Sequence, residues 1–229
     1  MTQSRLPYSI NMRLRASQIE AECDKSLRRL QVDTIDLFYA HCDDRQTPLE
    51  ETLGAFDSLV KAGKVRYVGA SNYLAWRLAE ADAVSQSHDF VSYCCIQQRY
   101  TYLRPVPGAS FSPQVAANDD LLDFCRSREM TMLAYSPLLT GAYTRSDREF
   151  MQQYQGPDSD ACIEALRQVS AELNATPNQV VYAWMWRHTP PVIPILGVST
   201  SAQLSENLGA LELVLTDDQV SRLNHPTAY

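Results

Sequence analysis

Apolar residues along this chain follow two alternating patterns. In residues 16–31 they stand three or four positions apart, as on one face of a helix, whereas residues 35–40 form a nearly continuous apolar run typical of a buried strand. The same two patterns alternate to the end of the sequence and predict five strand–helix units. The predicted strands are 35–40, 65–71, 93–103, 131–138 and 191–199, and the predicted helices are 16–31, 48–62, 73–85, 118–129, 158–174, 177–188 and 200–211, with a closing helical turn at 216–223.

Nearly continuous apolar strands separated by helices indicate an α/β fold with a parallel sheet covered on both faces. The first strand is not followed by Gly-x-Gly-x-x-Gly, so a (β/α) barrel is favoured over a dinucleotide-binding open sheet. In such barrels the chemistry lies at the carboxyl ends of the strands. Each predicted strand ends on polar residues or glycine, namely His41, Ser71–Asn72, Gln97–Tyr100, Tyr135–Ser136 and Gly197–Thr200.

Two helix starts carry capping signals. Thr47 is predicted to cap the helix that follows it, with Pro48 in the first turn, Glu50 at the capping-box position and Gly63 just after the end. Thr200 and Gln203 form the same pattern later in the chain. Free N–H groups at that second helix start also favour an anion.

Composition and charge exclude several classes of function. The chain has 229 residues, 45% of them hydrophobic, which is enough for a substantial core, and a net charge of −7 that argues against nucleic-acid binding. Six cysteines show neither metal-ligand spacing nor the density of a disulfide scaffold, and Cys94 and Cys95 are predicted to point to opposite faces of a strand. No apolar run suits a signal peptide or a membrane span. We therefore expect a cytoplasmic protein without a metal site.

Five segments of the sequence resemble the aldo-keto reductase family. They read SLRRLQVDTIDLFYAH (26–41), TPLEETLGAFDSLVKAGKVRYVGASNY (47–73), IQQRYTYL (96–103), AYSPL (134–138) and IPILGVSTSAQLSENLGALELVLT (193–216). The resemblance implies a TIM-type barrel that binds NADP(H) and reduces aldehyde or ketone carbonyls by hydride transfer. It also implies a catalytic set of Asp, Tyr, Lys and His, whose His matches His41 and would orient a substrate carbonyl.

The resemblance also implies a cofactor site. Ser71, Asn72 and Gln97 would hold the nicotinamide carboxamide, and Tyr135 would stack on the nicotinamide ring. The remaining positions would contact the pyrophosphate and the adenosine end of the dinucleotide; they are Ser136, Leu138, Thr140, Ser199, Thr200, Gln203, Glu206 and Asn207.

The positions expected to meet the 2′-phosphate of NADPH depart from the family pattern. The family often has Lys or Arg around the positions of Gly197, Ser199 and Gln203, and all three are uncharged here. Each lost charge-assisted hydrogen bond removes roughly 1.5–3 kcal/mol. A preference for NADPH is weakened, so NAD(H), or no cofactor, is an alternative.

The family's first three strands, with the catalytic Asp, Tyr and Lys, precede the helix that matches residues 16–31. We therefore expect residues 1–15 to be an N-terminal extension and residues 16–229 an incomplete barrel with the equivalents of strands 4–8. A positioned general acid contributes on the order of a hundred- to ten-thousandfold in rate, so activity of this chain alone is expected to be impaired. Strands 35–40 and 192–197 would be open edges, suited to a complementing chain or to self-association.

Two other functions stay open at this point. The chain could be a non-redox biosynthetic enzyme such as an isomerase, dehydratase or cyclase, with His41 and either Asp43 or Asp44 as acid and base. It could instead be a catalytically silent binding subunit. For Asp43 and Asp44 themselves, the expected role is that of solvated loop residues before a helix.

Overall fold

The computed structural model describes residues 13–226, which form two compact units divided between Cys94 and Cys95. We refer to residues 13–94 as unit 1 and to residues 95–226 as unit 2. Most of the predicted extension 1–15 lies outside the described residues. Five strands alternate with helices in the described part, which confirms the predicted α/β class.

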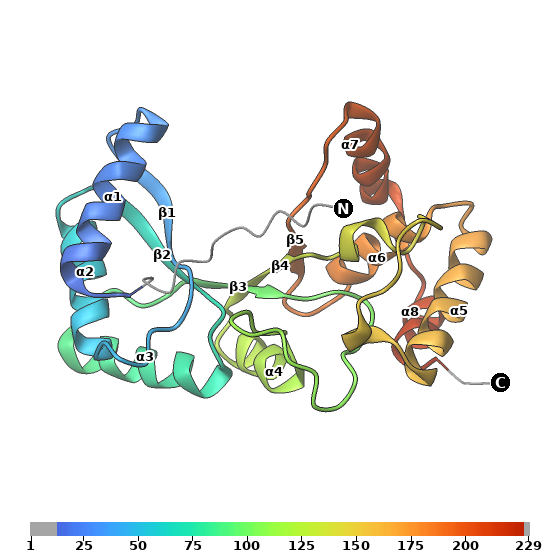
Figure 1. Cartoon of the computed structure of the whole chain (residues 1–229), viewed down its shortest axis with the longest axis horizontal. Coiled ribbons are helices and arrows are strands. Elements are labelled where there is room, and N and C mark those ends of the chain that lie inside the picture. Colours follow the sequence, from blue (N-terminus) through green and yellow to red (C-terminus); the bar gives the residue numbers. More distant parts are fainter. Residues whose placement is uncertain (1–12, 227–229) are drawn as a thin grey trace. The chain divides into compact units, whose positions relative to one another are not determined.

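Unit 1 contains three helices and a pair of parallel strands (Figure 1). In the register of the two strands, Ile35 pairs with Val65 and Ala40 with Ala70, so both strands end at the same level. The elements are α1 Ala16–Leu30, β1 Ile35–Ala40, α2 Leu49–Lys61, β2 Val65–Ser71 and α3 Ala75–His88.

The core of unit 1 lies between the strand pair and α2. Phe56 of α2 is 1% exposed and packs edge-on against Phe38 of β1, with ring centroids 5.9 Å apart, and against Tyr93 at 6.2 Å. Tyr93 in turn contacts Tyr73, which follows β2. This aromatic chain fixes the carboxyl end of β2 on the body of the unit.

Unit 2 contains the three parallel strands β3, β4 and β5 and five α-helices (Figure 1). Its helix α5 packs against α6 and α8, and α6 packs on β5 and α7. The elements are β3 Cys95–Arg99, α4 Asp119–Ser127, β4 Thr131–Tyr135, η1 Leu139–Gly141, η2 Gln152–Tyr154, α5 Pro157–Glu172, α6 Pro177–Trp186, β5 Val192–Pro194, α7 Ser201–Leu208, η3 Gly209–Glu212 and α8 Asp217–Asn224.

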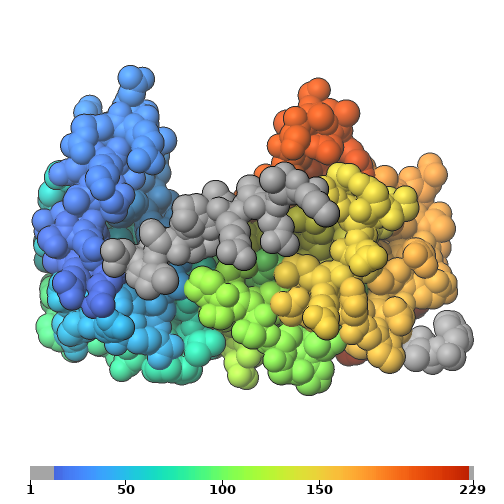
Figure 2. Space-filling view, in the orientation of Figure 1, coloured from blue at the N-terminus to red at the C-terminus, as the bar shows by residue number. Residues whose placement is uncertain are grey.

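Helix α7, coloured orange-red in Figure 2, projects from the rest of unit 2 in that view. Its side chains Leu204 and Leu208 are 39% and 46% exposed, and Leu211 in η3 is 63% exposed. At Gly209 the chain turns close to α6, where an added Cβ would lie 2.5 Å from Nε2 of Gln179. A larger residue here would displace the amide of Gln179, which donates to the Glu206 carbonyl over 2.9 Å.

The strand predictions are confirmed in unit 1 and partly wrong in unit 2. Strands 35–40 and 65–71 have the predicted bounds, but β3, β4 and β5 are shorter than 93–103, 131–138 and 191–199. The apolar residues after β3 are buried through loop contacts: the Tyr102 hydroxyl donates to the Leu223 carbonyl over 3.1 Å. Because these residues are buried by tertiary contacts and not by strand pairing, the sequence alone predicts a strand that is too long.

The predicted N-cap at Thr47 is also wrong. Helix α2 begins at Leu49 with Pro48 as its N-cap, and no side chain caps it. The Thr47 hydroxyl instead donates to Oδ2 of Asp44 over 2.6 Å. The glycine predicted after this helix is confirmed in its conformation, since Gly63 has φ of 71°.

The adjacent residues Cys94 and Cys95 point to opposite sides of the chain, as predicted, because Cys94 is exposed and Cys95 is buried. Within residues 13–226, no helix has both the length and the apolar character needed to cross a membrane.

Candidate functional site

The carboxyl ends of β1 and β2 bring three of the predicted residues together in unit 1. The side-chain amide of Asn72 donates to the backbone carbonyl of His41 and to the hydroxyl of Ser71, both over 3.0 Å. Ser71 and Asn72 are buried, whereas His41 is exposed. Asn72 has φ of 58°, a left-handed conformation that asparagine tolerates better than most residues. The result is a fixed backbone beneath an exposed imidazole.

The loop after His41 is held by two carboxylates. Asp43, whose side chain is 8% exposed, accepts from Nε of Arg77 over 3.2 Å and also pairs with Arg45. Arg45 lies over the ring of Trp76, 4.4 Å from its centroid. Since Arg77 and Trp76 belong to α3, Asp43 joins the loop to that helix.

Asp44 organises the second half of the same loop. It accepts from the backbone N–H groups of Leu14 and Gln46, both over 3.0 Å, and from the Thr47 hydroxyl. Burial alone would raise the pKa of Asp44, but these hydrogen bonds outweigh it and hold the pKa below its ordinary value. The expectation of solvated side chains is therefore wrong for Asp43, whereas Asp44 is half-buried; both are loop residues, as expected.

Gln97 and Tyr135 share one face of the strands in unit 2. Gln97 pairs with Leu133, and Leu133 pairs with Ile193, so these three side chains form a row across β3, β4 and β5. Tyr135 stands two residues beyond Leu133 and faces the same way. Both Gln97 and Tyr135 are partly exposed on this face.

A tight turn follows β4 and contains the predicted residues Ser136, Leu138 and Thr140. Ser136, Leu139 and Thr140 have φ of 56°, 48° and 60°, and Gly141 has φ of 88°. A left-handed conformation costs of order 1–3 kcal/mol for each of the three non-glycine residues, and such strain is typical of functional sites. The turn is closed by a hydrogen bond from the Gly141 N–H to the carbonyl of Leu138 over 2.8 Å.

Thr200 and Gln203 form the predicted capping box at the start of α7. The Thr200 hydroxyl accepts from the Gln203 N–H over 3.2 Å, and Oε1 of Gln203 accepts from the N–H groups of Ser199 and Thr200 over 2.8 and 3.3 Å. Ser199, Thr200 and Gln203 are all exposed. The side chain of Gln203 is thus engaged by the backbone.

Glu206 and Asn207 lie at the other end of α7, against α6. Oε1 of Glu206 accepts from the Thr176 hydroxyl, and its backbone carbonyl accepts from Nε2 of Gln179, both over 2.9 Å. Asn207 is 5% exposed. These contacts anchor α7 to the capped start of α6.

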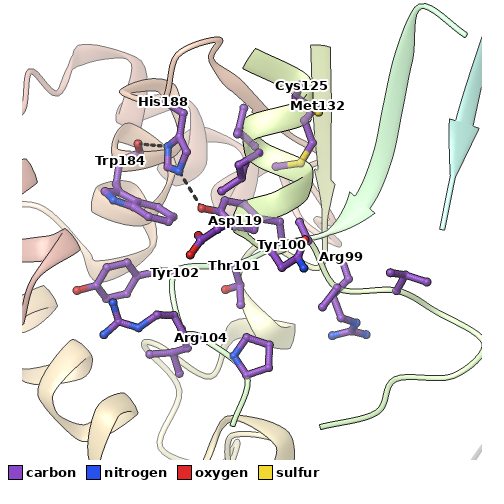
Figure 3. A pocket seen from close by; sticks show the side chains of 18 of the residues that line it. Arg99, Tyr100, Thr101, Tyr102, Arg104, Asp119, Cys125, Met132, Trp184 and His188 are labelled. Atoms are coloured by element: carbon purple, nitrogen blue, oxygen red, sulfur yellow. Dashed lines mark hydrogen bonds between the residues drawn. The ribbon is translucent and has the colours of Figure 1, made fainter. Parts of the chain in front are cut away.

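A cavity of about 1130 Å³ in unit 2 was not predicted (Figure 3). Tyr100, Tyr102 and Trp184 form an aromatic wall, in which Tyr100 stacks on Trp184 with centroids 5.7 Å apart and Tyr102 meets it edge-on at 5.3 Å. Arg99 and His188 also line the cavity. The signal in the sequence was Arg99 at the end of a strand, with Tyr100 and Tyr102 close behind it.

His188 and Tyr100 are joined in that cavity. Nδ1 of His188 lies 3.2 Å from the carbonyl of Trp184, which can only accept, so Nδ1 carries the proton. Nε2 then accepts from the Tyr100 hydroxyl over 2.8 Å. Burial lowers the pKa of His188 and raises that of Tyr100, with the charge of Asp119 adding to the latter shift. Both side chains are therefore neutral near pH 7.

Metal ligation has no support in the described part of the chain, where no group of three or more His, Cys, Asp or Glu side chains is placed to hold an ion.

Comparison with known proteins gives a consistent result. The model of the Aldo/keto reductase family matches residues 2–226. Aldo-keto reductase str7 from Strobilurus tenacellus is 34% identical over 217 residues, or 89% of this chain and 61% of that protein. Aldo-keto reductase yakc (NADP+) from Schizosaccharomyces pombe is 31% identical over 219 residues, or 90% of this chain and 61% of that protein.

The chain is also similar to a solved structure, that of the thermostable aldo-keto reductase Tm1743 in complex with the inhibitor epalrestat. It matches with a TM-score of 0.73 and 27% identity, covering 92% of this chain and 66% of that one. This likeness confirms the predicted (β/α) barrel type of fold. The chain spans about three-fifths of the length of the two relatives above.

Proposed function

Because this chain belongs to the aldo/keto reductase family, we propose that it forms part of an NAD(P)H-dependent oxidoreductase that reduces aldehyde or ketone carbonyls. The observation that carries the proposal is the family match over residues 2–226. The name of the relative yakc, which includes NADP(+), supports the choice of cofactor class. The substrate is a small-molecule carbonyl compound.

His41 is the proposed substrate-orienting residue. Its imidazole is exposed and makes no hydrogen bond to the described residues, while its backbone is held by Asn72. A neutral imidazole N–H can donate to a carbonyl oxygen and polarise it. The nearby Asp43 and Asp44 serve the loop instead, since their oxygens accept from Arg77 and from backbone N–H groups.

The proposed cofactor contacts follow the strand ends of each unit. In unit 1, Ser71 and Asn72 would hold the nicotinamide carboxamide. In unit 2, the family pattern assigns an amide contact to Gln97, stacking on the nicotinamide ring to Tyr135, and the pyrophosphate to the turn Ser136–Thr140. Support comes from the left-handed turn, because successive backbone N–H groups in such conformations form concavities that bind anions.

The adenosine end of the cofactor is assigned to α7, through Ser199, Thr200, Gln203, Glu206 and Asn207. No Lys or Arg occurs in residues 188–221. A 2′-phosphate at this helix would therefore lack a cation from that segment, and the proposal includes acceptance of NADH beside NADPH.

A direct titration tests the proposal. Residues 1–229 are titrated with NADPH and with NADH while protein fluorescence and nicotinamide fluorescence are followed. Saturable binding of either dinucleotide at micromolar concentration, weakened at least fivefold in Gln97→Ala, is the expected result. Gln168→Ala changes an exposed glutamine of α5 and is the matched control. Absence of binding, or equal weakening in both variants, would refute the assignment.

Catalysis by residues 1–229 assayed alone is expected to be slow. The family's tyrosine general acid belongs to positions before the segment matching residues 16–31, and such an acid contributes on the order of a hundred- to ten-thousandfold. The measurement is the rate of NADPH oxidation with a simple aldehyde in excess. A rate equal to that of a full-length relative would contradict the expected impairment.

A binding subunit is the second candidate, because large apolar side chains are exposed on the strands of both units. Tyr67 of β2 is 61% exposed and Ile193 of β5 is 47% exposed. Such surface is typical of an association site. Size-exclusion chromatography with light scattering tests it: a homo-oligomer or a captured partner supports association, and a monomer at high concentration contradicts self-association.

A further inference from the structure

Aromatic side chains and arginines both line the cavity of unit 2, where Arg104 lies near Tyr102 (Figure 3). Figure 3 shows Tyr102 and Trp184 on one side and Arg99 on the opposite side. Leu122, Met132 and Leu223 also line the cavity, so its surface is apolar as well as aromatic. A volume of about 1130 Å³ is ample for a small organic molecule.

Four arginines line this cavity, and three of them have an acidic partner. Arg104 pairs with Asp158 over 2.5 Å, Arg126 pairs with Asp123 over 3.2 Å, and Arg187 pairs with Asp217. Arg99 is the exception, since no carboxylate within residues 13–226 lies within ion-pair distance of it.

The partners of Arg99 are all neutral. Its Nε and Nη2 donate to Oε1 of Gln114 over 3.1 and 2.8 Å, and its Nη1 points at Sδ of Met151 at 3.8 Å. Its guanidinium also lies over the rings of Phe111 and Tyr135, at 5.0 and 5.7 Å.

Arg99 is nevertheless only 8% exposed. A guanidinium remains charged at all ordinary pH values, and burying a charge is costly unless an opposite charge compensates it. The amide and the aromatic rings compensate only part of this cost. An anion that enters the cavity would supply the rest.

We propose that the cavity of unit 2 binds an organic carboxylate with an aromatic body, and that Arg99 is the anion-binding group. The planar N–H fork of arginine matches the two oxygens of a carboxylate. The carboxylate lies at Arg99, and the ring lies toward Tyr102 and Trp184. Asp119, which also lines the cavity, repels an anion from the side of Tyr100.

The test compares two ligands of the same shape with an anionic or a neutral head group, phenylacetate and phenylacetamide. Calorimetric titration of residues 1–229 is carried out without dinucleotide, so its result does not depend on the proposed redox function. Charge-assisted hydrogen bonds predict that phenylacetate binds at least tenfold more tightly than phenylacetamide. Equal affinity for the two, or no binding of phenylacetate, would overturn the proposal.

Two variants then locate the anion. Gln114→Glu places a fixed carboxylate on Arg99, and we expect it to abolish the preference for phenylacetate and to raise the melting temperature of the free protein. Arg99→Gln removes the charge and gives the same loss of preference by the opposite route. Arg167→Gln, an exposed arginine on α5, is the control and keeps the tenfold preference. If Arg99→Gln or Gln114→Glu folds and still prefers phenylacetate tenfold, the role of Arg99 is refuted.

Discussion

The side-chain amide of Asn72 donates a hydrogen bond to the backbone carbonyl of His41 over 3.0 Å. This bond joins the residue after β2 to the residue after β1. It fixes the backbone of the one histidine to which we assign a catalytic role. Asn72 suits the position because it combines an amide donor with a left-handed backbone.

Two substitutions separate these contributions. Asn72→Gly keeps the backbone conformation but leaves the carbonyl of His41 without its donor, so we expect a loss of about 1–2 kcal/mol in the free energy of unfolding. Asn72→Ala adds the cost of a left-handed alanine, for a total of about 2–4 kcal/mol. Urea denaturation followed by circular dichroism measures both. Equal stability of the two variants would show that backbone strain plays no part.

The buried ion pair of Asp43 and Arg77 is expected to stabilise the loop after His41. Their side chains are 8% and 11% exposed, so Asp43→Asn removes one of the two carboxylates that pair with Arg77 and should cost about 1.5–3 kcal/mol, while Glu80 keeps its contact to Nη1 of Arg77 over 2.7 Å. Asp36→Asn is the control, because Asp36 and Arg66 form an exposed pair, 77% and 64% exposed, worth less than about 1 kcal/mol. Similar urea midpoints for the two variants would contradict this difference.

His188 predicts a pH dependence of stability. Burial lowers the pKa of His188 in the folded chain, so below the unfolded pKa near 6.5 the unfolded chain binds a proton that the folded chain does not. Stability from this residue is therefore present at neutral pH and decreases as the pH falls below that value. Melting temperatures between pH 7.5 and 5 should fall more steeply in the wild type than in His188→Gln.

His88, on the surface of α3, provides the control for that experiment. We expect His88→Gln to keep the wild-type slope of melting temperature against pH. A wild-type slope in His188→Gln would mean that the buried imidazole does not titrate in the way its surroundings predict.

The spacing of apolar residues predicted the fold, because helical spacing and continuous apolar runs both reflect which side chains are buried. Strands 35–40 and 65–71 pair with each other and pack on α2 through side chains such as Phe38, and their bounds are confirmed. Beyond Arg99 the pattern misled, because Tyr102 and Leu103 are buried by distant residues, including a hydrogen bond from the Leu103 N–H to the hydroxyl of Tyr143. Local sequence does not encode such long-range burial.

The sequence predicted that His41, Ser71 and Asn72 lie together, because they stand at or directly after the ends of the neighbouring strands β1 and β2. The cavity at Arg99 was not, because it depends on the partners of four arginines. Arg104, Arg126 and Arg187 look like Arg99 in the sequence, and only their contacts to Asp158, Asp123 and Asp217 set them apart.

Cofactor preference should respond to a single added charge. Ser199 is exposed at the start of α7, and no cation lies in residues 188–221. We expect Ser199→Arg to tighten binding of NADPH about tenfold through one charge-assisted contact to the 2′-phosphate, and to leave NADH unchanged. Leu204→Arg, an exposed position farther along α7, is the control. Equal tightening of both dinucleotides by Ser199→Arg would contradict the assignment of α7 to the adenosine end.

The most direct measurement of the proposed dinucleotide site is chemical-shift mapping by nuclear magnetic resonance during titration with NADPH. We expect the largest amide shifts at Ser71, Asn72, Gln97 and Tyr135, and no change at exposed helix positions such as Gln168. Shifts confined to other residues, with these four strand-end positions unaffected at saturation, would contradict it.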